Sequence, residues 1–319
     1  MKKAYIYVLL GTILFSTMEV TLKTMVGDFH PIQMTLTRFL IGGLCLLPLA
    51  RRALRQRQLR IEWRDVAQFA GLGFCCVVVS MVFYQLAVMN ANASVVAVLF
   101  SANPVFMTLF AYLLLHEHIH RLNLVALGLE ILGILIIINP LNTHISATGI
   151  LFTLLAMVTF PLYGALGKKQ SHKFGGIVIT CASAILGALE LLLLTLAARI
   201  PAVAAFLSST GLSLFVDVPL FSGYTAANIL PVLYVFIFVT GGGYACYFMA
   251  MENASTTTAS LIFFFKPILA SLLAFLFLHE PMPLNMLLGI LFVLGGSIAS
   301  IRGNQLLAAG QLLKEKERG

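Results

Sequence analysis

The sequence consists largely of hydrophobic stretches that are each about as long as a membrane is thick. A helix needs about 20 apolar residues to cross the hydrocarbon of a bilayer. The stretches near that length are 4–26, 31–49, 66–88, 94–115, 122–138, 148–167, 177–197, 227–250, 255–278 and 284–301. Only 10% of the 319 residues are charged, against about 25% in a typical soluble domain. The sequence therefore predicts an all-α polytopic membrane protein with ten transmembrane helices.

The distribution of Lys and Arg indicates which loops are cytoplasmic. If the N-terminus lies in the cytoplasm and the spans alternate, sixteen of the twenty Lys and Arg residues lie on the cytoplasmic side. This distribution follows the positive-inside rule, and it explains the net charge of +8 without a nucleic-acid partner. We therefore expect a multi-pass protein of the plasma or inner membrane with both termini in the cytoplasm.

An internal repeat has an offset of 163 residues. YQLAVMNANASVVAVLFSANPVFMTLFAYLLLHE, from Tyr84, aligns without a gap with YFMAMENASTTTASLIFFFKPILASLLAFLFLHE, from Tyr247. Each half holds five spans, and because five is odd the second half enters the membrane from the opposite side, as in many transporters. The predicted division is a first five-helix repeat at 1–140, an inverted second repeat at 141–302 and a cytoplasmic tail at 303–319.

Residues 198–226 are apolar enough to suggest a further span. Pro201, Gly211 and the four Ser and Thr residues between 208 and 213 make a membrane helix unfavourable there. We expect an external loop, and the sequence leaves open whether this loop lies on the membrane.

Six ionisable side chains fall within the predicted spans. They are Glu19, Lys23, Arg38, Glu130, Glu190 and Lys266. A charge at the centre of a bilayer costs about 2.5–3.5 kcal/mol even on the lower scale, so each of these groups needs a partner or a wet cavity. Three acids and three bases are consistent with neutralisation inside the protein.

Lys266 lies near the middle of its span. Pro267 follows it and removes the backbone donor that would bond the carbonyl of Phe263, and loosened turns of this kind line cavities in transporters. We expect Lys266 to face a central cavity and to bind an anionic substrate group or a proton-carrying carboxylate. The alternative is a structural ion pair with Glu130 or Glu19. The repeat counterpart of Lys266 is Asn103, which is also polar and also precedes a proline.

Glu19 is the preferred candidate for carrying a proton. It lies four residues before Lys23 and therefore on the same helix face, so the two can pair; a static pair is the alternative. Arg38 is too deep to reach the membrane surface easily and needs an internal partner or a substrate carboxylate.

Three further residues complete the predicted site. Glu130 could act simply as a counter-ion, so it is a weaker candidate for the functional site than Glu19. Tyr84 and Tyr247 are repeat counterparts that could line a pocket for a small organic molecule; anchoring at the membrane interface is the competing explanation.

The string His116-Glu117-His118-Ile119-His120 formally matches the HExxH zinc motif. That chemistry needs both histidines on one continuous helix and a third ligand, whereas this string lies in a short turn between spans. The equivalent turn of the second half reads HEPMP and has no second histidine. We therefore expect no metal and no cofactor, and an intramembrane zinc hydrolase remains only as the alternative from another class.

The two five-span halves resemble the EamA-type members of the drug/metabolite transporter superfamily. The features that carry the resemblance, over residues 4–301, are an N-A-S stretch, a mid-helix proline and a closing His-Glu in each half. The resemblance implies ten helices, cytoplasmic termini and a central cavity lined by both halves. It also implies transport of amino acids or other small metabolites.

The resemblance extends to a few residues. Glu117 and Glu280 match glutamates that close the fourth and ninth helices and look structural, and Pro104 and Pro267 match mid-helix prolines. Arg38 fits a second-helix arginine. When the sequence is aligned with itself at an offset of 145 residues, Ser183 is the counterpart of Arg38 in the second half. Lys266 is not general to the family, so it bears on the substrate or coupling ion of this branch.

The resulting prediction is a secondary active transporter of a small polar metabolite, an amino acid or a related carboxylate or amine. It would work by alternating access and would be coupled to protons. We expect no enzyme activity. The alternatives are an uncoupled facilitative transporter and a lipid-embedded scaffold. The expected partners are the substrate, the bilayer and protons, and the sequence leaves open a homodimer.

Overall fold

The structure, a computed structural model, describes residues 2–115, 121–138, 146–253, 256, 259 and 261–318. Within this part the chain is helical and contains no β-strand longer than an isolated bridge. The helices of the first half are α1 (Lys2–Thr24), α2 (Pro31–Gln56), α3 (Trp63–Gly73), η1 (Phe74–Ser80), α4 (Met81–Asn90), α5 (Ala93–Phe100), α6 (Asn103–Leu115) and α7 (Arg121–Ile138). Those of the second half are α8 (Ala147–Phe174), α9 (Gly176–Ala197), α10 (Pro201–Ser209), η2 (Ser213–Phe215), α11 (Ile229–Leu233), η3 (Tyr234–Gly243), α12 (Tyr244–Asn253), α14 (Ile262–Leu278) and α15 (Leu284–Arg318).

Many of these helices can cross a membrane. Seven helical segments of the described residues are long and apolar enough to do so, and three shorter apolar helices accompany them at Leu124–Ile137, Lys266–Leu278 and Leu284–Ala299. The outer surface is rich in exposed Leu, Ile and Phe side chains, as expected where lipid is the solvent. The chain is therefore an all-helical, multi-pass membrane protein.

Local sequence explains where several helices begin and end. Pro31 is the first residue of α2, where its missing N–H has no partner to lose, and the His30 ring accepts a hydrogen bond from the Ile32 amide. The Ser146 side chain caps α8 by accepting from the Gly149 amide at 3.1 Å. Gly175, with φ of +86°, separates α8 from α9 in a conformation that other residues rarely adopt.

Two π-helical segments interrupt the spans at related places. One, η1, ends at Ser80 and is followed by α4, and the other, η3, ends at Gly243 and is followed by α12. These two boundaries are 163 residues apart, which is the offset of the sequence repeat. Wide π turns often occur at functional sites, and here both lead into the helices that carry Tyr84 and Tyr247.

Glycines allow two close helix contacts that also correspond between the halves. A side chain on Gly42 of α2 would lie 2.6 Å from the Phe236 carbonyl oxygen, and one on Gly187 of α9 would lie 2.5 Å from the Gly73 carbonyl oxygen. Small residues of this kind let membrane helices approach closely. Gly42 and Gly187 are counterparts at the offset of 145 residues, and Gly73 and Phe236 are counterparts at the offset of 163 residues.

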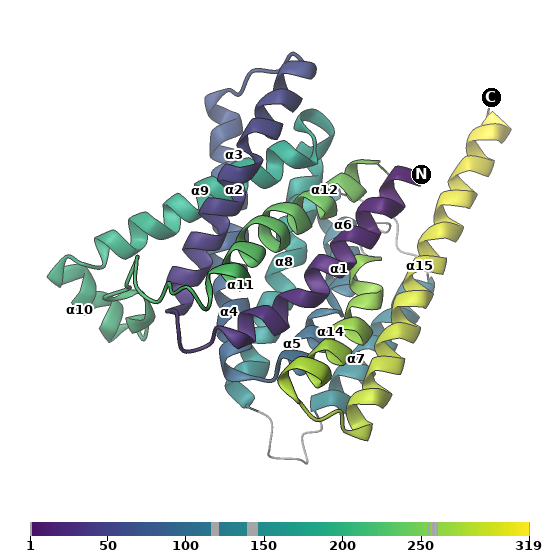
Figure 1. Cartoon of the computed structure of the whole chain (residues 1–319). Coiled ribbons are helices and arrows are strands. Elements are labelled where there is room, and N and C mark those ends of the chain that lie inside the picture. Colours follow the sequence, from purple (N-terminus) through teal and green to yellow (C-terminus); the bar gives the residue numbers. More distant parts are fainter. Residues whose placement is uncertain are drawn as a thin grey trace.

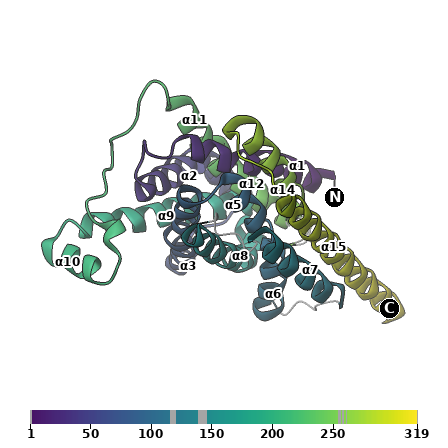
Figure 2. The same ribbon diagram turned by 90° about the horizontal axis from the view of Figure 1, so that it is seen from below.

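The edges of the molecule are formed by α15 on one side and α10 on the other (Figures 1 and 2). α15 packs along α7, where Gly133 and the Gly289 backbone meet, and it continues as a helix to Arg318, through most of the predicted tail. α10 lies in the predicted external loop at 198–226 and has only nine residues, too few to span a bilayer.

The predicted span at 94–115 is not one continuous helix. α5 ends at Phe100, a turn follows at 101–102, and α6 begins at Asn103. Pro104 has no N–H to bond the Phe100 carbonyl, so the α-helical hydrogen bonds cannot continue through this point. In α14, by contrast, Pro267 lies inside the helix. The break brings Asn103 to the start of a helix in the middle of the molecule.

Candidate functional site

The most deeply buried charges form an ion pair between helices far apart in the sequence. Lys266 Nζ of α14 lies 2.5 Å from Glu19 Oε1 of α1, and both side chains are 0% exposed. α1 packs along α14, which is why these two groups meet. Of the alternatives that the sequence left open, the structure therefore pairs Lys266 with Glu19. Removing one member of such a pair leaves a buried charge and costs about 3–5 kcal/mol.

Aromatic rings surround the ammonium group of Lys266. Its Nζ lies 4.8 Å from the ring centroid of Phe100, 5.6 Å from that of Tyr84 and 5.9 Å from that of Phe263. Cations are attracted to ring faces at such distances. Phe100 and Phe263 are counterparts in the repeat and contact each other edge to face, so Lys266 lies where the two halves meet.

Arg38 of α2 is fully buried and has no carboxylate partner among the described residues. Its Nη1 donates weakly to Met18 Sδ at 3.7 Å, and its guanidinium lies 4.9 Å from the ring centroid of Phe39. Nε and Nη2 find no hydrogen-bond partner in the described part of the chain. Buried polar groups normally have partners, so this arginine retains unused capacity to bind an anion.

A small cavity adjoins Lys266. Met18, the contact of Arg38, lines it together with Lys266 and the aromatic residues Phe15, Phe100, Phe160, Tyr244 and Phe263 and with Met81. Its volume is about 10 Å³, which is close to the least that one water molecule needs. This cavity is therefore too small for a metabolite.

The polar residues predicted beside Lys266 are also buried. Asn103, Tyr84 and Tyr247 are each at most 1% exposed, and their Nδ2 or hydroxyl groups have no hydrogen-bond partner among the described residues. Tyr247 packs against Phe160 and Phe263, with ring centroids 5.4 and 5.9 Å apart. Neither tyrosine lies at a helix end on the surface, so the structure does not support interfacial anchoring.

Sequence reasoning did not include Tyr244 and Met81 among the site residues. The Tyr244 hydroxyl donates to Met81 Sδ at 2.7 Å, and the two residues are counterparts in the repeat. A contact between counterparts is expected on an axis that relates the halves. The alignment contained this signal, because it pairs the two residues three positions before its quoted stretch.

A sequence model of the EamA-like transporter family matches residues 2–139 and again residues 147–302. This chain belongs to the EamA-like transporter family. The resemblance inferred from the repeat and the His-Glu ends is thereby confirmed.

Relatives of this EamA-like transporter carry names of the same kind. An uncharacterized transporter of Clostridium kluyveri is 37% identical over 313 residues, which is 96% of this chain and 95% of that protein. An uncharacterized transporter of Archaeoglobus fulgidus is 25% identical over 243 residues, 76% of this chain and 80% of the other. A solved crystal structure shares the fold with a TM-score of 0.67 at 16% identity, covering 96% of this chain and 99% of that one.

Two predicted site residues of this EamA-like transporter lie away from the ion pair. Lys23 does not pair with Glu19; its Nζ donates to the carbonyls of Val88 at 2.9 Å and Ala91 at 2.7 Å, at the end of α4. Glu130 of α7 faces α15, where the Ser297 hydroxyl donates to it at 3.5 Å. The Glu19–Lys23 pair was therefore a wrong prediction: helix packing gives each residue another partner.

Glu280 caps the N-terminus of α5. It accepts hydrogen bonds from the amides of Ala93 at 2.8 Å and Ser94 at 2.9 Å and from the Ser94 hydroxyl at 2.5 Å. A carboxylate is favoured at a helix N-terminus by the unpaired amides there. Glu117, the repeat counterpart, and the rest of the HExxH-like string at 116–120 lie outside the described residues.

Replacing Glu280 with glutamine is expected to lower the free energy of unfolding by about 1–2 kcal/mol. Glutamine keeps the shape but loses the charge and one acceptor, and charge-assisted hydrogen bonds contribute more than neutral ones. Thermal unfolding of the purified protein would measure the loss. His279→Asn is the matched control, because His279 is exposed and asparagine tolerates its φ of 53°. Equal stability of both variants would contradict the capping role.

The opposite end is held by ion pairs that the sequence reasoning missed. Arg57 pairs with Glu252, whose Oε2 also accepts from the Gly176 amide at 2.7 Å, and Lys173 lies 2.9 Å from Asp65. Glu252 has methionine as its repeat counterpart, so the alignment gave no signal for it. In the described part of the chain no three His, Cys, Asp or Glu side chains are placed to hold a metal ion.

Proposed function

We propose that this EamA-like transporter is a secondary active transporter of a small polar metabolite that carries a carboxylate, such as an amino acid. It works in the plasma or inner membrane by alternating access and is coupled to protons through Glu19. The observation that carries the proposal is the fully buried Lys266–Glu19 pair beside Arg38, which has no acidic partner among the described residues.

The proposed architecture has ten membrane helices in two inverted repeats, 1–140 and 141–302, with both termini in the cytoplasm. It is supported by the family model, which matches each half separately. It is also supported by the corresponding ends of the two π-helical segments. The contact between the counterparts Tyr244 and Met81 agrees with a symmetry axis at the centre. An inverted pair allows two similar conformations that open to opposite sides.

The charges at the centre favour an anionic substrate group. Lys266 and Arg38 contribute two positive charges there, and Glu19 contributes one negative charge, so one positive charge is left over. A substrate carboxylate could pair with Arg38, and arginine suits this role because its planar guanidinium can bind both carboxylate oxygens. The unpartnered groups of Tyr84 and Asn103 would supply further hydrogen bonds to the substrate.

Transport requires the centre to open towards each side in turn. At one end, opening would break the Glu280 cap on α5 and the hydrogen bonds of Lys23 to α4. At the other end, it would break the Arg57–Glu252 pair and separate the start of α9 from α12. These two sets of contacts are the proposed closures of the alternating cycle.

Proton coupling follows from competition for Lys266. A substrate carboxylate that approached Lys266 would compete with Glu19, and Glu19 would then be a buried carboxylate without its cation. An unpaired charge in a dry interior is costly, so Glu19 would take up a proton. Release of the substrate would restore the pair and release the proton.

A thermal-shift screen of the purified protein tests the substrate class. Ligands with a carboxylate are expected to raise the unfolding temperature, because a ligand at 100 times its Kd stabilises by about 2.7 kcal/mol. Arg38→Gln should abolish the shift, while Arg199→Gln, a charge change in the external loop, should leave it unchanged. Stabilisation by amines alone, or an equal shift in the Arg38 variant, would contradict the proposal.

A further inference from the structure

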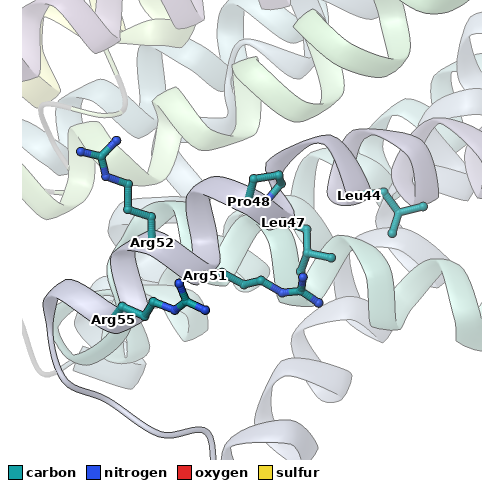
Figure 3. Close-up of a pocket in the computed structure, with 6 residues that line it drawn as sticks. All are labelled: Leu44, Leu47, Pro48, Arg51, Arg52 and Arg55. Carbon is teal, nitrogen blue, oxygen red and sulfur yellow. The ribbon is translucent and has the colours of Figure 1, made fainter.

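The end of α2 that holds Arg57 also carries three exposed arginines over a hollow in the surface. Arg51, Arg52 and Arg55 line this hollow together with Leu44, Leu47 and Pro48, and its volume is about 510 Å³ (Figure 3). None of the three arginines pairs with an acidic side chain in the part of the chain that the structure describes. Their neighbour Arg57 does pair, with Glu252. The hollow is therefore cationic at one end and apolar at the other.

A second hollow of about 400 Å³ adjoins the first and shares Leu47 and Arg51 with it. Its walls come from α2, from the start of α3 and from α9, and include Phe69, Val178 and Ile185. Arg51 is the only charged residue among those that line it. An apolar trough between helices that ends at a guanidinium has the form of a site for a chain with an anionic head.

The side chains are arranged to serve both hollows. In Figure 3, Arg51 and Arg55 extend on the same side of α2, and Arg51 reaches back towards Leu47, while Arg52 points to the other side of the helix. Arg51 and Arg55 are one helical turn apart, so both can reach one phosphate. Arginine binds phosphate oxygens through parallel hydrogen bonds.

We propose that these two hollows bind an anionic phospholipid of the cytoplasmic leaflet, such as phosphatidylglycerol. Its phosphate lies between Arg51 and Arg55, and one acyl chain occupies the trough between α2, α3 and α9. The proposal rests on the topology given under the proposed function, in which this end faces the cytoplasm. Basic pockets between membrane helices on that side are suited to anionic headgroups. The positive-inside rule accounts for arginines at this level but not for an apolar trough that leads to one of them.

The single tryptophan of the chain, Trp63, provides the measurement. It lies at the start of α3, two residues after Ile61 of the trough, and is 82% exposed. The protein is reconstituted in vesicles in which brominated phosphatidylglycerol competes with unbrominated phosphatidylcholine, and quenching of Trp63 reports the relative affinity. Native mass spectrometry of the protein in detergent counts the phosphatidylglycerol molecules that remain bound.

The expected result is a clear preference for phosphatidylglycerol that falls about fivefold for each of Arg51→Gln and Arg55→Gln. Arg302→Gln, at the same proposed level on α15, is the control and should leave the preference unchanged. An equal loss in the control would show an unspecific effect of surface charge. Quenching no stronger than the share of brominated phosphatidylglycerol in the bilayer predicts, or displacement of the lipid by inorganic phosphate, would overturn the site. The Lys266→Met variant should keep this preference while losing transport, so failure of the lipid site and failure of the proposed function are distinguishable.

Discussion

Replacing Lys266 with methionine is expected to reduce transport in proteoliposomes by at least about 30-fold. The substitution keeps most of the side-chain volume but removes the charge that would meet the substrate carboxylate, and truncating a buried charged pair costs about 2–5 kcal/mol in binding. Because Glu19 would be left without its cation, the variant should also be less stable, by up to about 3–5 kcal/mol. Initial rates of uptake and thermal unfolding measure the two effects separately.

The double variant Glu19→Gln with Lys266→Met separates function from folding. It removes both charges of the pair, so neither position is left with an unpaired charge, and its stability should return close to that of the wild type. Its transport should remain absent, because neither the cation nor the proton carrier is present. A double variant that transports at the wild-type rate would show that the pair is structural and that the chain does not use it for transport.

Replacing Glu19 with glutamine alone is expected to make transport independent of pH and of an imposed proton gradient. Glutamine can still accept a hydrogen bond from Lys266, but it cannot exchange a proton during the cycle. Counterflow of labelled substrate, which needs no net driving force, should persist at a reduced rate. Measurements of uptake with and without a pH gradient across the vesicle membrane give the result.

Two other intramembrane glutamates serve as comparisons for Glu19. Glu190 of α9 is only partly buried and is placed away from the ion pair, so Glu190→Gln should keep the pH dependence. Glu130→Gln should keep it as well. If the dependence survives in the Glu19 variant and disappears in the Glu130 variant, the proton carrier lies between α7 and α15. If the wild type itself shows no dependence, the protein is an uncoupled facilitative transporter.

The lysine at position 266 shows how far sequence reasoning reached. Its depth in an apolar stretch was sufficient to predict a buried charge with a partner, because the cost of an unpaired charge in a membrane is independent of the fold. Its partner was left open between Glu19 and Glu130. That choice depended on which helix packs against α14, and no local pattern in the chain records helix neighbours.

The closing contacts at the two ends show a similar limit. Glu280 was recognisable as a helix-closing residue, but its target, the amides of Ala93 and Ser94, lies in the other half of the chain. For the same reason the partner of Arg57 was not predicted, and the one predicted for Lys23 was wrong. The helix break before Asn103 is different: Pro104 marks it in the sequence, yet Pro267 in the equivalent place lies inside a helix.

The sequence by itself determined that the chain is a multi-pass membrane protein of the EamA-like family. Transfer of apolar side chains from water to lipid is a property of each stretch alone, and the family motifs are local. Only the tertiary structure decided that Lys266 meets Glu19 and that Arg38 has no acidic partner in the described chain. These features depend on the packing of helices that are far apart along the chain, and packing is a property of the whole fold.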